Sequence, residues 1–161
     1  PTLRHHPLRR KQTMKTGLFV GSFDPFTIGH DNIVRRAVGL FDRLVIGVGD
    51  NPGKQCMFSL EERVRAIREL YADDPRIEVT SYSDFTIDLA QRVGARYIVK
   101  GVRSVTDFEY ERIQNDFNQR LGGIETVLLY ADPTMTSISS SAVRQLIHFH
   151  KDADWMIPKK K

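Results

Sequence analysis

A candidate anion-binding segment spans residues 21–30, where Gly-Ser-Phe-Asp-Pro-Phe-Thr-Ile-Gly-His joins an apolar run to a stretch of helical periodicity. Gly21 and Gly29 can let a phosphate approach the backbone closely, or adopt dihedral angles that other residues avoid. A helix start adds free N–H groups and the positive end of a dipole. His30, in the first helical turn, could donate a hydrogen bond to a phosphate oxygen. An isolated histidine would more simply bond to a nearby carbonyl, but the sequence Thr27-x-Gly-His after a strand favours the phosphate.

Three more polar segments follow predicted strands. Lys54 lies in a turn-forming stretch, Lys100 and Arg103 flank Gly101, and the hydroxyl-rich run 136–141 leads into a predicted helix. Cations held beside a phosphate can neutralise charge that develops during a reaction. The simpler alternatives are solvated surface cations and a helix-capping serine, and the residues alone leave these open.

Two carboxylates accompany these cations on another predicted helix. Asp107 and Glu111 are one helical turn apart and therefore share a face. They could be surface carboxylates, or ion-pair partners of Arg103 and Arg112. The same helix is expected to pack through its apolar side chains, which are Phe108, Ile113 and Phe117.

Apolar runs of strand length alternate with segments of helical period along the chain, a pattern typical of a parallel sheet covered by helices on both faces. The predicted strands are 17–20, 44–48, 77–80, 97–99 and 126–129. Five helices are predicted. The first spans 29–40, the second follows Ser59, which forms a capping box with Glu62, and the third spans 86–93 with Asp84 as its cap. The fourth runs from Thr106, in a capping box with Glu109, to residue 121, and the fifth starts in serines 139–141 and carries Val143, Leu146 and Ile147 on one face. This is an α/β fold, a Rossmann-like, doubly wound, five-stranded parallel sheet. Ligands of such folds bind beyond the carboxyl ends of the strands, which is where the polar segments fall.

The composition is that of one ordinary globular domain. The chain has 161 residues and a formal charge of +4, with the excess of cations concentrated in residues 4–15 and 159–161. Since charges nearly cancel between residues 16 and 158, locally basic pockets are favoured over a surface for nucleic acid. The single Cys56 excludes an internal disulfide framework and a cysteine metal site, and fits a reducing cytoplasm.

The ends of the chain are expected to lie outside the folded domain. No apolar run approaches the roughly 18 residues that a membrane span needs, and residues 1–13 have no secretory apolar region. We expect residues 1–13 to be a disordered basic leader or the remnant of an added sequence, with Met14 as the natural start. The predicted catalytic domain is then 14–158, with a basic tail at 159–161.

Over residues 15–158 the chain resembles the nucleotidyltransferases that carry a T-x-G-H or H-x-G-H signature, and among them the phosphopantetheine adenylyltransferase family. The resemblance rests on separated blocks in the right order, which are 21–25, 57–63, 101–103, 107–111 and 138–141. It implies transfer of the adenylyl group of ATP to 4'-phosphopantetheine, giving dephospho-coenzyme A and pyrophosphate. It also implies a homohexamer. Mg²⁺ is expected to accompany ATP and shield its triphosphate, and a cytoplasmic location is expected, with no nucleic-acid or membrane partner.

The resemblance also implies the site residues. The ATP-binding positions are Ser22, Phe23, His30, Gly101, Val102, Arg103, Glu111, Met135, Thr136, Ser137, Ile138, Ser139, Ser140 and Ser141. The positions for the acceptor substrate are Ser22, Lys54, Thr86 and Lys100, and the catalytic positions are His30, Lys54, Lys100 and Arg103. No metal ligand is expected from the protein. The family commonly has arginine at position 100 and often tryptophan at position 135, where this chain has Lys100 and Met135.

The predicted chemistry is positioning and charge stabilisation, because no activated nucleophile is evident. The acceptor phosphate would attack the α-phosphorus of ATP in line, oriented by Ser22 and Lys54, while His30 with Lys100 and Arg103 stabilises charge. Three alternatives stay open. They are a related transferase that uses nicotinate mononucleotide, or CTP with glycerol phosphate, in which histidine usually replaces Thr27; a non-catalytic nucleotide sensor; and weak RNA binding through the basic tail.

Overall fold

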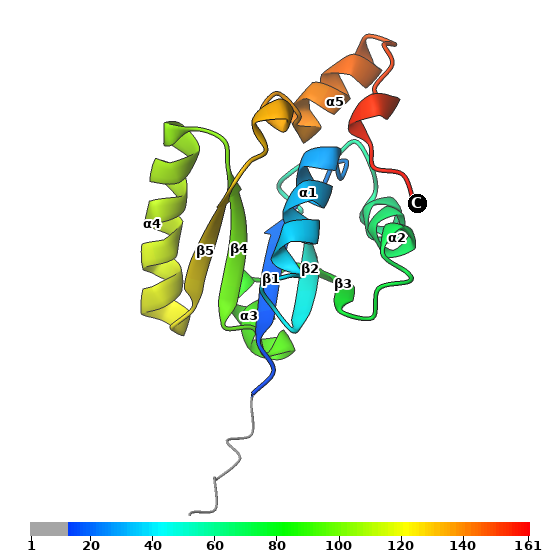
Figure 1. Ribbon diagram of the computed structural model, residues 1–161. Coiled ribbons are helices and arrows are strands. Elements are labelled where there is room, and N and C mark those ends of the chain that lie inside the picture. Colours follow the sequence, from blue (N-terminus) through cyan, green and yellow to red (C-terminus); the bar gives the residue numbers. More distant parts are fainter. Residues whose placement is uncertain (1–12) are drawn as a thin grey trace, which may run out of the picture.

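The computed structural model describes residues 13–161, so the predicted leader lies outside the described residues except for Thr13. Five parallel strands form one sheet in the order β3-β2-β1-β4-β5 (Figure 1). The strands are β1 (Thr16–Gly21), β2 (Arg43–Gly49), β3 (Ile77–Tyr82), β4 (Tyr97–Val102) and β5 (Glu125–Tyr130). The predicted five-stranded fold and each predicted strand are therefore confirmed.

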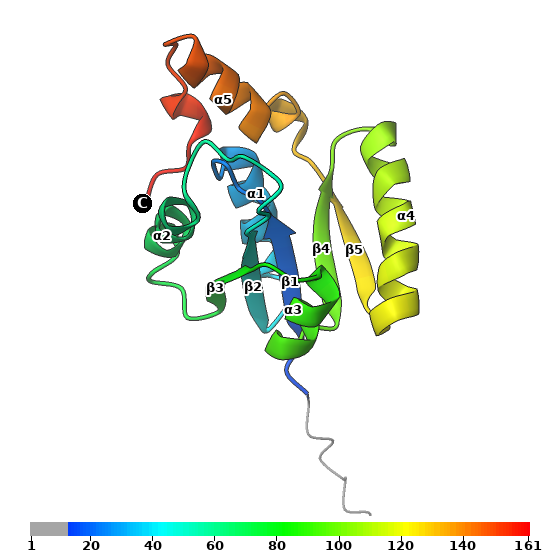
Figure 2. The same ribbon diagram turned by 180° about the vertical axis from the view of Figure 1, so that it is seen from behind.

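Helices follow the strands in the expected alternation. They are α1 (Ile28–Ala37), α2 (Leu60–Leu70), α3 (Thr86–Val93), α4 (Val105–Gly122) and α5 (Ser140–His148), with short 3-10 helices at Pro133–Met135 and Asp154–Met156. Figures 1 and 2 show α1 and α2 on one face of the sheet, α3 on the other, and α4 along the β5 edge. The last helix, α5, lies beyond the carboxyl ends of the strands, at the top of both views.

The two faces of the sheet bury alternate residues of the same strands. Phe19 and Ile46 belong to a core shared with α1 and α2, whereas the neighbouring Leu18 and Val45 belong to a core shared with α3. Successive strand side chains point to opposite faces, so a strand covered on both sides is apolar throughout. A third, smaller core joins α5 to the carboxyl-terminal segment through Val143 and the residues packed around it.

One of the two predicted capping boxes is present at the start of its helix, and the other is not. The capping box of Ser59 and Glu62 is confirmed, since each side chain accepts a hydrogen bond from the other residue's backbone N–H. The predicted box of Thr106 is wrong, because α4 already begins at Val105 and Ser104 caps it by accepting from Asp107 N.

Two further helix ends also differ from prediction. The helix α1 ends at Ala37, so its expected extension to residue 40 is wrong. Asp84 does not cap α3, whose N-cap is Phe85 without a side-chain hydrogen bond, because the Asp84 carboxylate is paired with Arg92 instead.

The expected packing of α4 is wrong for the single chain. No residue of α4 is buried, and Phe108, Ile113 and Phe117 are 43%, 54% and 57% exposed. A helix at the edge of a sheet has few neighbours to cover its apolar side chains, and the contacts of α4 are largely limited to β4, β5 and α3. None of the helices within residues 13–161 combines the length and the apolar character needed to cross a membrane.

Candidate active site

A cavity of about 420 Å³ opens where β1 and β4 end, and its lining residues come from both strand ends, α1, α4 and the start of α5. The winding of the chain reverses between β1 and β4, since β2 and β3 continue on one side and β5 on the other. This is the switch point at which doubly wound sheets bind ligands. The cavity therefore lies where the sequence places the polar segments.

His30 occupies the third position of α1 and forms a capping box with Thr27. The backbone N–H of Thr27 donates to His30 Nδ1 at 3.0 Å, and the Thr27 hydroxyl lies 3.1 Å from the same nitrogen. Because Nδ1 accepts, the proton of the neutral ring resides on Nε2. The imidazole thus lines the cavity with an N–H donor on its other nitrogen.

The surroundings of His30 keep the ring neutral. The rings of Phe23 and Phe26 lie 5.0 and 5.2 Å from it, centre to centre. Burial, with the positive charge of Arg103 as a second cause, lowers the pKa of His30 to about 4. At neutral pH the residue is therefore a hydrogen-bond donor rather than a cation.

One aromatic residue beside the cavity has a positive φ. Neither Gly21 nor Gly29 has a positive φ, so the suggestion that they adopt unusual dihedral angles is wrong. Phe23 does, with φ of 49°, and it is 3% exposed. A bulky residue in the left-handed region costs conformational energy and must be held there by its packing.

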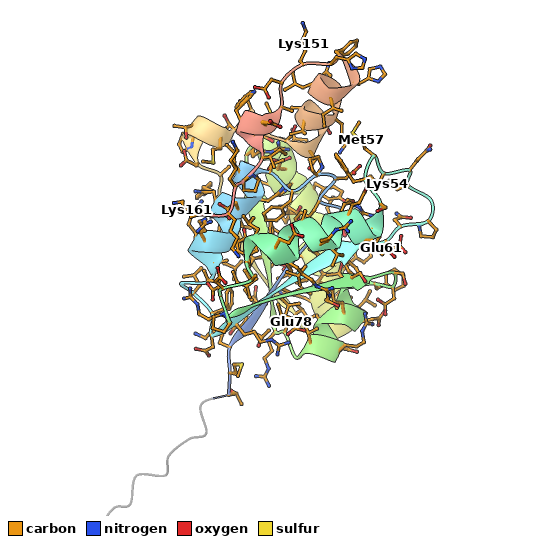
Figure 3. The ribbon with its side chains drawn as sticks, turned by 90° about the vertical axis from the view of Figure 1, so that its right-hand side faces the viewer. Lys54, Met57, Glu61, Glu78, Lys151 and Lys161 are labelled. Atoms are coloured by element: carbon orange, nitrogen blue, oxygen red, sulfur yellow. The ribbon has the colours of Figure 1, made fainter. Side chains whose placement is uncertain are left out.

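Lys54 reaches the cavity from the loop that precedes α2. Its Nζ donates to Ser22 Oγ at 3.1 Å, which joins a cation to the hydroxyl that follows β1. Figure 3 shows Lys54 and Met57 on this loop, on the side of the molecule where α5 lies. The pair offers one charge and one hydroxyl to a phosphate.

The cations after β4 are engaged by α4. Lys100 Nζ lies 3.5 Å from Glu111 Oε2, and Arg103 Nε lies 3.5 Å from Asp107 Oδ2. One of the alternatives for Asp107, an ion pair with Arg103, is therefore present. These separations are those of loose ion pairs rather than short hydrogen bonds.

The serine run brings a second helix start to the cavity. Ser139 caps α5 by accepting from Ala142 N at 3.0 Å, which confirms a capping role for one serine. Ser140 Oγ donates to Pro25 O at 2.8 Å and fastens α5 to the segment after β1. The starts of α1 and α5 therefore both offer N–H groups and positive dipole ends to the same hollow.

The sequence model of the cytidylyltransferase-like family matches residues 18–146. A phosphopantetheine adenylyltransferase of Bacteroides fragilis is 49% identical over 146 residues, covering 91% of this chain and 97% of the relative. The chain belongs to the phosphopantetheine adenylyltransferase family. A member from Porphyromonas gingivalis is 48% identical over 141 residues, covering 88% and 92%, and one from Rhizorhabdus wittichii is 42% identical over 148 residues, covering 91% and 90%. The resemblance that the sequence motifs indicate is confirmed.

A solved structure supports the fold of this adenylyltransferase family member independently. The bifunctional NMN adenylyltransferase/ADP ribose pyrophosphatase from Francisella tularensis superposes with a TM-score of 0.69 over 92% of the chain at 15% identity. The same protein complexed with AMP and a manganese ion gives a TM-score of 0.66. The chain spans about half the length of that protein, covering 46% of it, and the likeness concerns the fold alone.

Most positions that the adenylyltransferase motifs predict line one cavity. They are Ser22, Phe23, His30, Lys54, Lys100, Gly101, Arg103, Glu111, Met135, Ile138, Ser139, Ser140 and Ser141. Four predicted positions are absent from the lining. Val102 is buried in β4, Thr136 and Ser137 are exposed, and Thr86 lies at the start of α3 with its hydroxyl 3.4 Å from Tyr82 Oη.

Arg144 is a lining residue of this family member that our sequence analysis missed. It donates from Nη1 to Asp24 O at 2.8 Å and from Nη2 to Ser141 Oγ at 3.1 Å. Its position three residues after Ser141 on a helix that starts at the site was a usable signal, since such residues share a face. Asp24 carries no comparable signal, because its partners are distant in sequence.

Within residues 13–161 no three His, Cys, Asp or Glu side chains gather in a way that could hold a metal ion. The carboxylate of Asp24, which lines the cavity, already accepts two backbone N–H groups. A protein-held Mg²⁺, which needs several oxygen ligands, does not fit these residues.

Proposed function

We propose that the chain transfers the adenylyl group of ATP to the phosphate of 4'-phosphopantetheine, giving dephospho-coenzyme A and pyrophosphate. The observation that carries the proposal is the meeting of His30, Lys54 and Arg103 with two helix starts in one cavity, in a member of this family. Donors and cations fixed in advance around a hollow suit a reaction in which negative charge moves between phosphates.

The reaction we propose is a single displacement. An oxygen of the acceptor phosphate forms a bond to the α-phosphorus of ATP, and the bond from that phosphorus to the bridging oxygen breaks, so pyrophosphate leaves with the electron pair. No covalent enzyme intermediate is needed, because positioning converts the bimolecular attack into an effectively unimolecular step. The alcohol of Ser22 is occupied as the acceptor of the Lys54 ammonium, which is not the arrangement of an activated nucleophile.

The cavity residues divide this work. Lys54 and Ser22 would hold the acceptor phosphate, and the Nε2–H of neutral His30 would bond to an oxygen of the reacting phosphate. Arg103 and Lys100 would stabilise the triphosphate charge after leaving their carboxylate partners on α4. His30 therefore acts by a directed hydrogen bond, and the cations supply the charge.

The pantetheine arm would leave the cavity along β2 toward α3. Gly49 ends β2, and a side chain there would come within 3.8 Å of Tyr82, whose hydroxyl lies beside Thr86. The neighbouring Phe85 is 79% exposed and offers apolar surface to such an arm. This path would give Thr86 its predicted role although it lies outside the cavity.

Mg²⁺ belongs to this proposal as a companion of ATP rather than as a resident of the protein. The described residues hold no carboxylate cluster for it, so no step is assigned to a protein-bound ion. A cytoplasmic location is proposed together with the activity, since ATP is one of the two substrates.

The test is release of pyrophosphate by the purified chain with ATP, Mg²⁺ and one acceptor at a time. Turnover with 4'-phosphopantetheine is expected, and none with nicotinate mononucleotide or with glycerol phosphate and CTP. Release with another acceptor alone would assign the chain to a related transferase. ATP binding without release in any mixture would indicate a nucleotide sensor.

We also propose that the chain assembles with copies of itself, with the homohexamer of the resemblance as the expected form. Tyr110, Ile113, Phe117 and Leu121 form a helical stripe on α4, and all are more than half exposed in the single chain. An apolar stripe of this kind on an edge helix commonly marks an interface.

Light scattering of the purified chain tests the assembly. Phe117→Glu should lower the measured mass toward that of the monomer, because it places a charge in the stripe. Phe149→Glu is the control, since Phe149 is also exposed but lies at the end of α5, outside the stripe. A wild-type chain that is monomeric would refute the proposed assembly.

A further inference from the structure

The block 57–63 matches the family motifs, yet no residue of it has a role in the reaction so far. Arg63, on α2, is only 6% exposed and forms no ion pair with any carboxylate of residues 13–161. A buried guanidinium is costly unless its N–H groups are satisfied. Its partners therefore indicate what it is for.

All the hydrogen bonds of Arg63 go to backbone carbonyls from three different segments. Its Nη1 donates to Ser22 O at 2.7 Å and to Gly49 O at 3.0 Å, and its Nε donates to Phe58 O at 3.1 Å. The planar guanidinium thus joins the residue after β1, the end of β2 and the residue that precedes the N-cap of α2. A lysine could not make this set of bonds, because its single ammonium lacks the fork.

Asp24 fastens the same loop from the other side. Asp24 is 2% exposed, and its two carboxylate oxygens accept from Met57 N and Phe58 N, each at 2.9 Å. The backbone of Asp50 is tied to Tyr82 O at 2.8 Å. Both ends of the loop from Asp50 to Phe58 are consequently fixed, while the residues between them project from the body.

Lys54 lies between these two anchored ends, and its ammonium meets Ser22 Oγ. Arg63 therefore holds both partners of that pair. It bonds to the backbone carbonyl of Ser22 directly, and it holds Lys54 through Gly49 and Phe58, which flank the loop. A displacement of about 1 Å at such a pair can lower a rate by about 100-fold.

We propose that Arg63, assisted by Asp24, is a positioning residue that sets Ser22 and Lys54 at the spacing required by the acceptor phosphate. The inference rests on the proposed function for the identity of that phosphate. Arg63 touches neither substrate, and its effect passes through the backbone of the two residues that do. The nucleotide side of the cavity, formed by β4, α4 and α5, receives no hydrogen bond from the Arg63 guanidinium, and its tie to this region runs through Arg144, which donates to Asp24 O.

The first test compares Arg63→Lys and Arg63→Gln with the wild-type chain in steady-state kinetics. We expect kcat/KM for 4'-phosphopantetheine to fall by about 10- to 100-fold, and KM for ATP to change by less than about twofold. Arg68→Gln is the matched control, because Arg68 is on the same helix and also donates to a backbone carbonyl, that of Val79. Equal changes in both KM values, or equal effects of the Arg63 and Arg68 variants, would overturn the proposal.

The second test asks whether Arg63 acts through Lys54. In a Lys54→Met background, Arg63→Lys should cost several-fold less in kcat/KM than it does in the wild-type background, because one of the two residues that it positions is gone. A cost as large as in the wild-type background would show that Arg63 does not act through Lys54.

A third readout needs no substrate and separates this inference from the proposed function. Trypsin cleavage after Lys54, followed by mass spectrometry, should be at least about fivefold faster in Arg63→Lys than in the wild type or Arg68→Gln, since the loop loses the bonds that Arg63 makes to its two flanks. If the wild type fails to turn over 4'-phosphopantetheine but this difference appears, the proposed function fails and the anchoring stands. If the wild type turns over 4'-phosphopantetheine but Arg63→Lys is cleaved no faster than the wild type, the proposed function stands and the anchoring of the loop by Arg63 is refuted.

Discussion

The two walls of the cavity are built in different ways. On the wall after β1, Asp24 and Arg63 are buried and bond to backbone groups, which holds Ser22 and Lys54 in place. On the wall after β4, the cations are paired with carboxylates of α4, a helix without a buried residue. The Arg103–Asp107 pair is partly exposed, and such pairs are typically worth only about 0–1 kcal/mol, so the arginine can readily exchange its carboxylate for a phosphate. The wall after β1 is thus preformed, whereas the wall after β4 can adjust.

The residue between the walls should show the largest effect. His30→Ala removes the Nε2–H that both walls surround, and we expect kcat to fall by about 10²–10³-fold, as for the loss of one preorganised donor. Initial rates of pyrophosphate release measure this. Thermal unfolding of the variant is the control, and full turnover by a folded His30→Ala protein would contradict the assigned role.

The neutral state of His30 makes a prediction about pH. Its pKa is lowered to about 4 in the folded chain from 6.5, so the unfolded chain binds more protons between these values. The wild type should therefore lose about 2 to 3 kcal/mol of unfolding free energy from this group as pH falls from 6.5 to 4.

Denaturant unfolding of the wild type and of His30→Gln across that range measures the difference. The variant should lose less stability, because glutamine does not titrate. The wild-type rate should also show no inflection near pH 6.5 that is due to His30. An inflection there that is lost in His30→Gln would mean that His30 titrates in the working enzyme.

The preformed wall predicts a selective effect of Lys54. Lys54→Met should raise KM for 4'-phosphopantetheine by about 10-fold and leave KM for ATP within about twofold, because the ammonium pairs with Ser22 on the acceptor side. Steady-state kinetics with each substrate varied in turn measures the two constants. Equal increases in both would mean that the walls do not divide the substrates.

The adjustable wall predicts the smallest effect. Glu111→Gln removes the charge opposite Lys100 but keeps an amide oxygen that can accept a hydrogen bond from it, and we expect kcat/KM for ATP to change by less than about threefold. Raising the salt concentration should weaken ATP binding by a similar factor in both proteins. A loss of 100-fold would show that Glu111 contacts the nucleotide directly and that this wall is as preformed as the other.

Prediction from sequence succeeded where the controlling interactions are local. The alternation of apolar runs and helical periods located each strand, and the Ser59 capping box spans only four residues. It failed at Thr106, where Ser104 is an equally suitable cap two residues earlier, and at Asp84, whose carboxylate pairs with Arg92 in the last turn of α3 and does not cap that helix. The prediction that the polar segments lie close together succeeded because parallel strands all have their carboxyl ends at one edge of the sheet.

The sequence by itself determined that a histidine follows the first strand in the first turn of a helix, and that cations follow two other strands. Only the tertiary structure decided that Arg63 reaches Ser22 and Gly49, that the His30 ring is enclosed and neutral, and that the apolar side chains of α4 stay exposed. These properties depend on contacts between residues far apart in the chain and on the exclusion of water. Neither is encoded in the spacing of neighbouring residues.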